Sequence, residues 1–350
     1  MIQKPIQKLV KIFISVICYY LGLIWFARHV FPRRGVLILA FHRVNDHAVD
    51  ILNLRVRVKD FETQLTYLRK HYRLVSLQEA IDTLRSEKNL PSNTVVITFD
   101  DGYTDNYLHA FPILQKLSIP ATIFLTLEPI ETRSALWFDE IQGCILSTHV
   151  HSVDLRKFSL PAFPIATRKQ KQKMIEHIVE EIKRNWDFKK VPMFIDYLHR
   201  QLSVPRKNGK SDLMLTWEQV TDMKGGGIEF GAHTMTHPIL THIGDQELNY
   251  EIAKAKEILE GKVGAPVAFF AYPNGEARDF NAVVVDRLKS CGYRGACTLI
   301  PGVNSEPNFF SLKRLGIDED YTGFAGHFTK EVFAAEMTGI LDCLFFRKWR

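Results

Sequence analysis

The sequence predicts an α/β protein built on a parallel β-sheet, either closed into a barrel or open. Three runs, at 36–41, 94–99 and 121–127, are almost continuously apolar, which is typical of strands buried on both faces. Polar residues and then a segment with helical periodicity follow the first two runs, and this alternation favours a parallel sheet. The length of 350 residues allows one barrel of roughly 250 residues with an insertion.

The chain begins with a hydrophobic segment, and we predict a membrane-associated helix within residues 1–34. The run 12–27 contains only Ser15 and Gly22 as non-hydrophobic residues. Its length of about 16 residues is short of the ~20 needed to span a bilayer, so a helix lying in the interface or one short span is favoured. A helix packed on the domain itself is the alternative. The flanking basic residues leave the membrane side undecided; they are Lys4, Lys8, Lys11, Arg28, Arg33 and Arg34.

The rest of the chain predicts a barrel domain over 35–328 with a helical insertion at about 129–212. Ser76 with Glu79 three residues later resembles a capping box, and Asp245 is a candidate N-cap. The predicted helices are 61–72, 76–85, 107–117, 217–224, 245–260 and 281–291. The later predicted strands are 228–231, 267–271, 295–298 and 310–317.

Two further segments complete the organisation. The insertion has no buried-strand pattern and contains a charged helix at 169–186. Its Trp137 and Phe138 suit either a sugar-binding surface or the core. Residues 329–350 predict an amphipathic helix whose aromatic and basic end suits a lipid headgroup interface, although a packed helix with a solvated end fits equally well.

Composition narrows the function classes. The chain is 46% hydrophobic and 24% charged, so a sizeable core can form. The net charge of +6 comes from dispersed Lys and Arg, and we expect no nucleic-acid partner. The five cysteines include no CxxC pair, which makes a disulfide framework or a cysteine-rich zinc site unlikely.

Polar residues that directly follow buried strands mark the candidate site, because barrel active sites lie at those strand ends. Asp100 and Asp101 end the run 94–99, and two adjacent carboxylates repel unless a cation offsets their charge. His233 and His237 are four residues apart, so on one helical turn they would share a face. Two imidazoles and one carboxylate form a three-ligand site with open positions, as in catalytic zinc sites. A simple Asp-Asp-Gly turn and core or solvent-facing histidines remain the alternatives.

Together these motifs resemble those of the NodB-homology polysaccharide deacetylases, carbohydrate esterase family four. TFDDGY at 98–103 and HTMTHP at 233–238 are similar to the two metal-site motifs, and FAYPNG at 270–275 to the third. GYR at 292–294 is similar to the region of the fourth. The resemblance covers roughly 36–318 outside most of the insertion, and it implies a distorted (β/α)7–8 barrel.

The resemblance also implies residue roles and a cofactor. Asp101, His233 and His237 would bind Zn²⁺, or another divalent ion such as Co²⁺, Ni²⁺ or Mn²⁺. Asp100 would act as general base, and the backbone N–H of Asn274 would stabilise the oxyanion. Thr98 and Thr234 are candidates for supporting hydrogen bonds.

The sequence departs from the family pattern at two roles. Ala271 occupies the place of the family's arginine that orients the base, and the aspartate that pairs with that arginine has no clear match. Arg314, at the end of a late strand, is the candidate to orient Asp100 instead. No late histidine occurs between 312 and 318, so we expect His42 to be the general acid. A histidine packed under a loop is the alternative for His42.

The predicted function is metal-dependent deacetylation of an N-acetyl sugar in an envelope saccharide or lipid-linked glycan, at a membrane surface. Hydrolysis of another amide, such as a small imide or ureide, is an alternative on the same fold. An inactive carbohydrate-binding protein would not need a base beside a metal. A non-haem iron oxygenase also uses two histidines and a carboxylate, but Asp100 and the motif match disfavour it.

Overall fold

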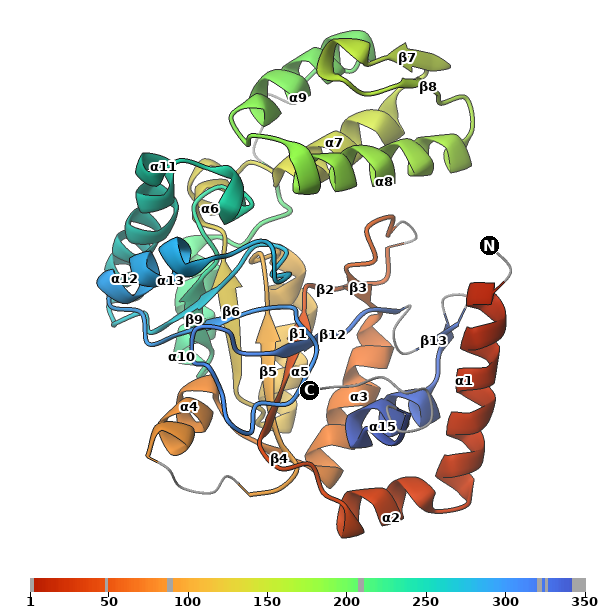
Figure 1. Cartoon of the computed structure of the whole chain (residues 1–350), viewed down its shortest axis with the longest axis vertical. Helices are drawn as coiled ribbons and strands as arrows, with labels where there is room; N and C mark the ends of the chain where they lie inside the picture. Colours follow the sequence, from red (N-terminus) through yellow and green to blue (C-terminus); the bar gives the residue numbers. More distant parts are fainter. Residues whose placement is uncertain are drawn as a thin grey trace.

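Parallel strands at the centre of the molecule form a nearly closed barrel in the computed structural model (Figure 1). The structure describes residues 3–47, 50–86, 91–206, 211–319, 323–324 and 327–341. Among them the main sheet has the order β11-β10-β9-β6-β5-β1-β12, with β4 paired to β5. Its strands are β1 (Val36–Phe41), β4 (Arg73–Leu74), β5 (Thr94–Phe99), β6 (Ala121–Leu125), β9 (Glu229–Ala232), β10 (Phe269–Ala271), β11 (Gly295–Cys297) and β12 (Arg314–Gly316).

The two ends of this sheet meet beside β11 and β12. Leu312, just before β12, pairs in parallel with Cys297 of β11. The Leu312 N–H donates to the Ala296 carbonyl at 2.9 Å, and the Thr298 N–H donates to the Leu312 carbonyl at 2.8 Å. The predicted fold class is therefore confirmed, and the barrel is closed except for short, interrupted pairing at this seam. The strands β1 and β5 are buried throughout, as their apolar runs predict.

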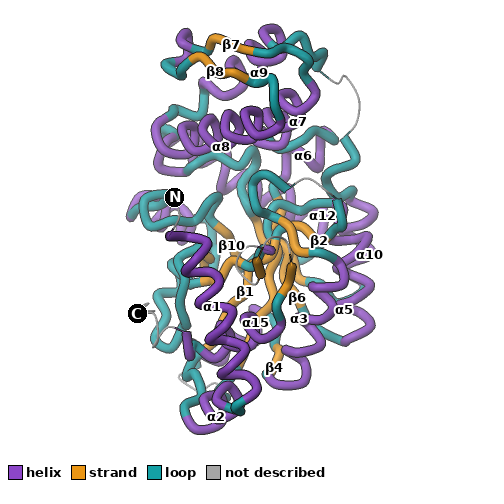
Figure 2. The backbone as a smooth tube through the Cα atoms, turned by 90° about the vertical axis from the view of Figure 1, so that its right-hand side faces the viewer, coloured by secondary structure: helices purple, strands orange, loops and turns teal. Residues whose placement is uncertain are grey.

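Helices surround the barrel (Figures 1 and 2). Ser76 caps α4 by accepting the Glu79 N–H, as predicted. The predicted helix at 245–260 is instead capped by Gly244, so the proposed cap at Asp245 is wrong, and a π-helical segment interrupts it. The helices are α3 (Val58–His71), α4 (Leu77–Arg85), η1 (Asn106–Ala110), α5 (Phe111–Leu117), α10 (Trp217–Gly225), η3 (Leu240–His242), α11 (Asp245–Asn249), η4 (Tyr250–Lys254), α12 (Ala255–Val263) and α13 (Ala282–Ser290).

The insertion forms a separate layer above one end of the barrel (Figure 1). It also contains a surface hairpin of β7 and β8, which the sequence analysis missed because these three-residue strands are mostly exposed and carry no apolar run. A further small sheet pairs β2 with β3. The elements of the insertion and its approach are α6 (Leu127–Thr132), α7 (Trp137–Ser147), β7 (Ser152–Asp154), η2 (Arg156–Phe158), β8 (Ala162–Pro164), α8 (Arg168–Asn185) and α9 (Lys190–Gln201). The strands of the further small sheet, outside the insertion, are β2 (Arg43–Val44) and β3 (Arg55–Val56).

The N-terminal segment is two helices, so the prediction of one helix is wrong. The helices α1 (Gln3–Tyr20) and α2 (Leu23–Val30) meet at an angle of 75°. Gly22 lies between them with φ 75°, a left-handed conformation that glycine adopts without steric cost and that ends a helix. Within the described residues no single helix is long and apolar enough to cross a membrane, although the bent pair together has the required length and composition.

The chain's two terminal regions pack together. Helix α1 lies against α15 (Lys330–Thr338), with α2 close by (Figures 1 and 2). Lys11 of α1 pairs with the buried Glu336 of α15 at 2.6 Å. Arg28 of α2 instead contacts the barrel helix α3, where it donates to the Tyr67 hydroxyl at 3.3 Å. A short hairpin of β13 (Gly323–Phe324) and β14 (His327–Phe328) precedes α15. The predicted aromatic and basic end of the tail, with Cys343, falls at 342–350, outside the described residues.

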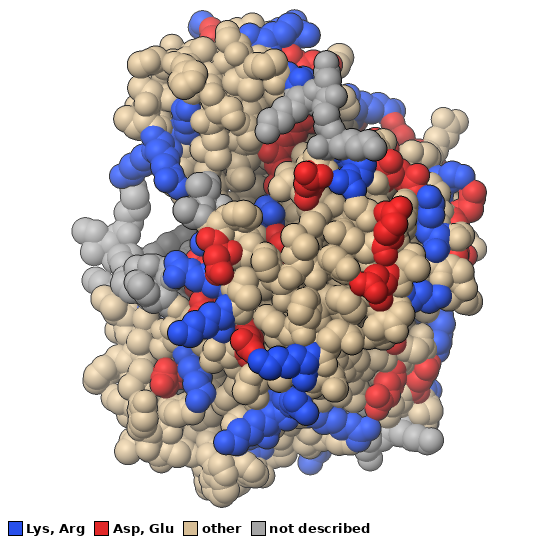
Figure 3. All heavy atoms as spheres, turned by 180° about the vertical axis from the view of Figure 1, so that it is seen from behind, with Lys and Arg blue, Asp and Glu red and all other residues tan. Residues whose placement is uncertain are grey.

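The surface carries both charge signs. On the face seen in Figure 3, basic and acidic side chains are largely intermixed, as expected from the dispersed Lys and Arg in the sequence. Of the described cysteines, Cys18, Cys144 and Cys297 are buried thiols and Cys291 is partly exposed, each without a disulfide.

Candidate metal centre and active site

Side chains from several strand ends converge at the end of the barrel that faces the insertion. His42 follows β1, Asp100 and Asp101 follow β5, and His233 follows β9. They line a pocket of about 240 Å³. The barrel contributes Asn274, Leu299, Gly316, Ile317 and Asp318, the β2–β3 region Leu52, Asn53 and Leu54, and the insertion Phe138, Val179 and Lys183.

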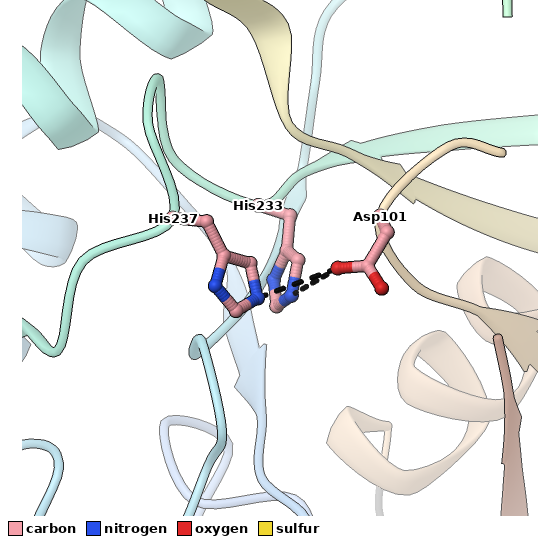
Figure 4. Close-up of side chains that lie close together, drawn as sticks. All are labelled: Asp101, His233 and His237. Carbon is pink, nitrogen blue, oxygen red and sulfur yellow. Dashed lines mark ion pairs between the residues drawn. The ribbon is translucent and has the colours of Figure 1, made fainter. Parts of the chain in front are cut away.

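The three predicted metal ligands point toward one another (Figure 4). The Asp101 Oδ1 atom lies 3.3 Å from His237 Nε2 and 3.6 Å from His233 Nε2. All three side chains are buried, and one donor atom of each lies within 4.8 Å of the others. The buried Asp101 Oδ1 atom has no hydrogen-bond partner among the described residues. A divalent cation would satisfy that oxygen and the two imidazoles, so this donor set fits Zn²⁺ or a similar ion.

His233 is held in the tautomer that a metal ligand needs. Its Nδ1 atom lies 2.7 Å from the Ala271 carbonyl oxygen, so Nδ1–H donates there and Nε2 keeps its lone pair. Burial lowers the pKa of His233 to about 4, which keeps the ring neutral at neutral pH. Thus Ala271 contributes to the site through its backbone carbonyl.

The loop that carries both histidines is not helical, which corrects the expectation that they share a helical turn. Thr234 and His237 have φ values of 71° and 63°, and Asp101 and Asn274 have 74° and 60°. Asp, Asn and His adopt left-handed conformations more readily than most residues, whereas the β-branched Thr234 does so only where surrounding contacts enforce it. One such contact is a hydrogen bond within the loop, in which the His237 backbone N–H donates to the Thr234 hydroxyl at 2.9 Å.

Glu251 in η4 fixes the same loop from outside the pocket. Its carboxylate accepts the backbone N–H groups of Met235 at 2.8 Å and Thr236 at 2.9 Å. It also accepts the Thr236 hydroxyl at 2.6 Å. The side chain is only 5% exposed, so these three bonds satisfy a carboxylate that water cannot reach.

The aromatic pair of the insertion packs against His237 rather than forming an open platform. The Trp137 indole N–H donates to the His237 carbonyl at 3.1 Å, and Trp137 is buried. Phe138 contacts the His237 ring edge-to-face with 5.3 Å between centroids. Of the two readings of Trp137, the core role is the one observed. These contacts fix His237, one of the predicted metal ligands, to the insertion.

Asp100 forms a buried, two-pronged ion pair with Arg314 of β12. Both Nη–Oδ distances are 2.7 Å, and the side chains are 1% and 0% exposed. Arg314 also donates to the Thr98 hydroxyl at 3.1 Å and the Thr298 carbonyl at 2.9 Å. Burial alone would raise the pKa of Asp100, but Arg314 outweighs burial and holds that pKa below its usual value.

His42 and Asn274 both border the pocket. The His42 Nε2 atom lies 3.9 Å from Asp100 Oδ2, and the side chain is 17% exposed. Asn274 lies in the loop after β10, where its side-chain amide donates to Asp279 at 2.6 Å. Six of the seven site residues proposed from the sequence therefore line one pocket, and the seventh, Arg314, is buried behind it and contacts Asp100.

Sequence reasoning missed Lys183 and Glu251. Glu251 does have a sequence signal, since it is an isolated acid within an apolar helical stripe that includes Leu248, Ile252 and Ala255. Lys183 has none, because its position over the pocket depends on how the insertion packs.

Comparison with known proteins agrees with this geometry. Residues 87–296 match the sequence profile described as polysaccharide deacetylase, which is more than half of the chain. The chain belongs to the polysaccharide deacetylase family. YxkH of Bacillus subtilis (strain 168) is 23% identical over 290 residues, which are 82% of this chain and 73% of YxkH. Poly-beta-1,6-N-acetyl-D-glucosamine N-deacetylase of Escherichia coli (strain K12) is 38% identical over 96 residues, which are 27% of this chain and only 14% of that protein.

Solved structures support the fold of this polysaccharide deacetylase family member. The Streptococcus pyogenes deacetylase PplD superposes with a TM-score of 0.56 at 20% identity, covering 83% of this chain and 95% of PplD. IcaB from Ammonifex degensii gives a TM-score of 0.54 at 22% identity, covering 83% of this chain and 94% of IcaB.

Proposed function

We propose that this polysaccharide deacetylase family member is a metal-dependent hydrolase that removes acetyl groups from the amino sugars of an envelope saccharide or lipid-linked glycan. The observation that carries the proposal is the convergence of Asp101, His233 and His237 beside the Asp100–Arg314 pair in one pocket. A second carboxylate that binds no metal, held ionised next to the metal ligands, suits a general base. The similarity to an enzyme named for poly-beta-1,6-N-acetyl-D-glucosamine supports N-acetylglucosamine as the acetylated sugar.

In the proposed reaction each residue of the site has a separate role. Asp101, His233 and His237 would hold a divalent cation, which would supply Lewis-acid polarisation and lower the pKa of water. Asp100 accepts the proton of the water that attacks the acetyl carbon, and Arg314 keeps its carboxylate ionised and oriented. The Asn274 backbone N–H donates to the carbonyl oxygen as negative charge develops. His42 protonates the amine nitrogen as the carbon–nitrogen bond breaks, so the products are acetate and the free amino sugar.

The test is acetate release from N-acetylglucosamine oligomers. The protein is assayed as purified, after complete chelation, and after Zn²⁺ is restored, with metal content measured each time. We expect activity to disappear and return with the metal. Asp100→Asn serves as a control that should keep the metal and lose the activity. Acetate release that persists in metal-free protein would overturn the mechanism, and no release from any N-acetylated sugar would overturn the function.

We further propose that α1 and α2 lie on a membrane surface. Their outward side is apolar and aromatic, with exposed fractions of 67% for Phe13, 74% for Tyr20, 59% for Trp25 and 72% for Phe31. Such a concentration on two neighbouring helices is typical of interfacial segments rather than of ordinary protein surface. Arg33 and Arg34, in the segment that follows α2, add charge that favours anionic lipid headgroups.

Flotation with vesicles of phosphatidylglycerol and phosphatidylethanolamine tests this membrane contact. The double variant Phe13→Ser/Trp25→Ser should float less than wild type, because two large side chains no longer enter the interface. Leu108→Ser, at a residue 54% exposed on η1, is the matched control and should float normally. Equal flotation of the double variant and wild type would contradict the proposal.

A further inference from the structure

The insertion brings a positive charge into the catalytic pocket. Lys183 lies in the last turn of α8, four residues after Val179, so both side chains lie on one face of the helix. Both line the pocket together with Phe138, and the barrel residues Asp101 and His237 line it as well. Helix α8 lies over this end of the barrel (Figure 1).

The other charges around the pocket are committed to partners, whereas Lys183 is not. Asp100 pairs with Arg314, and Asp101 lies beside His233 and His237. In the part of the chain that the structure describes, Lys183 forms no ion pair. The neighbouring carboxylate of Glu180 is instead paired with Arg184.

Lys183 is also partly withdrawn from water, and burial lowers its pKa, an effect that the negative charges of Asp101, Glu180, Asp279 and Glu276 oppose without forming an ion pair with it. An ammonium group that loses hydration without gaining a partner is destabilised. An anionic ligand would supply the missing partner. A lysine suits this purpose because its compact charge binds phosphate or carboxylate oxygens without requiring one fixed geometry.

The size of the pocket limits where that anion sits on the substrate. At about 240 Å³ the pocket is smaller than the roughly 300–1,000 Å³ typical of sites for drug-sized ligands. It therefore holds about one sugar residue, with the rest of any glycan outside. Because the metal ligands must receive the acetamide of that residue, a group that contacts Lys183 belongs to the same sugar.

We propose that Lys183 recognises a phosphate or carboxylate carried by the same sugar residue whose acetamide is cleaved. This inference rests on the proposed deacetylase function and narrows its substrate class to anionic N-acetylated sugars. The insertion thereby acts as a specificity element, since the barrel provides no lysine or arginine among the described pocket residues.

Three small substrates of similar size test the proposal. N-acetylglucosamine 1-phosphate carries a phosphate, N-acetylmuramic acid carries a carboxylate, and methyl N-acetylglucosaminide is neutral. For Lys183→Met we expect kcat/KM for one anionic sugar to fall by about 10- to 100-fold, because a charge-assisted hydrogen bond is lost. The loss on the neutral glycoside should be far smaller. The anionic sugar that shows the larger loss identifies the group recognised.

Two variants separate a specific effect from a structural one. Lys183→Arg keeps the charge and should recover most of the preference for the anionic sugar. Lys173→Met changes an exposed lysine of the same helix and should behave as wild type. Equal losses on anionic and neutral sugars, or no loss on either anionic sugar, would overturn the proposal.

A binding measurement distinguishes failure of this inference from failure of the proposed function. Calorimetric titration of metal-loaded Asp100→Asn with each sugar reports affinity without turnover. If wild type releases no acetate, the deacetylase proposal fails. The role of Lys183 then still stands or falls on whether Asp100→Asn/Lys183→Met binds the anionic sugars more weakly.

Discussion

Replacing Arg314 by methionine tests the best-defined ion pair of the site. Methionine keeps an unbranched apolar stem and removes the guanidinium that contacts both Asp100 oxygens at 2.7 Å. Because Asp100 is 1% exposed, water cannot take over the lost contacts. An uncompensated buried charge costs about 3–5 kcal/mol, so we expect the free energy of unfolding of the metal-free protein to fall by that amount at pH 7.

The pH dependence of this loss has a definite sign. In wild type, burial raises the pKa of Asp100 but Arg314 outweighs it, so the folded pKa lies below the unfolded value of ~3.9. That stability is present at neutral pH and is lost as pH falls through the low folded pKa. In Arg314→Met burial, the largest influence on Asp100, is opposed only by His233 and His42, so we expect the folded pKa to lie above ~3.9 and stability to fall as pH rises through this window. The gap between the two proteins therefore widens from acid to neutral pH.

Urea unfolding in the presence of chelator, from pH 4 to pH 7, measures this effect. The double variant Asp100→Asn/Arg314→Met should recover most of the loss, because replacing both partners leaves no unpaired buried charge. Arg73→Met removes an ion pair with Glu79 whose side chains are 54% and 49% exposed, and should cost ~1 kcal/mol or less. The metal-loaded Arg314→Met enzyme should also show the acid limb of its pH–rate profile shifted upward. A loss no larger than that of Arg73→Met, with an unshifted acid limb, would refute the reasoning.

The remaining predictions concern three other residues. His42→Ala should lower kcat by about 10²–10⁴-fold and remove the alkaline limb of the pH–rate profile, and a near-normal profile would exclude His42 as general acid. Glu251→Ala should weaken Zn²⁺ binding about 10- to 100-fold in chelator competition, because the loop that carries His233 and His237 loses three hydrogen bonds. The control is Glu257→Ala, at a residue 68% exposed on α12. Equal Zn²⁺ affinities of the two variants would contradict the prediction. Burial raises the pKa of Asp139 to about 6, so stability falls as pH rises from ~3.9 through that value. Asp139→Asn should therefore be ~2 kcal/mol more stable than wild type at pH 7 and equal to it near pH 4, and an unchanged difference would contradict this.

Much of the barrel could be predicted because its strands are buried on both faces. The runs that form β1, β5 and β6 carry almost no polar residue, so pattern and position agree. The N-terminal segment was harder, because hydrophobicity alone does not distinguish one long helix from two. In the sequence Gly22 is simply a non-hydrophobic residue within the run, whereas in the structure its left-handed backbone is where the helix breaks.

The chemical residues of the site could be predicted from motif strings, but the backbone that holds them could not. Four-residue spacing favours a helical turn, whereas His233 and His237 lie in a loop with left-handed residues at Thr234 and His237. That conformation depends on tertiary contacts from Glu251 and Trp137, which lie on other elements. Local spacing carries no information about such contacts, so the shared direction of the imidazoles was predicted for the wrong reason.

An uncharged residue at Ala271 and the presence of Arg314 beside Asp100 are physically consistent. Asp100 is buried, so a fold of this kind needs one guanidinium near it, and two would leave a charge unpaired. Any strand that borders this end of the barrel could provide that guanidinium. Strand β12 meets this condition, because it pairs with β1 in register from Ile38–Arg314 to Ala40–Gly316, and β1 pairs in turn with β5 directly before Asp100. Closure of the barrel thus carries Arg314 to the carboxylate, 214 residues away in sequence. At the end of β10, Ala271 contributes to the site through its backbone carbonyl, which accepts the His233 Nδ1–H group.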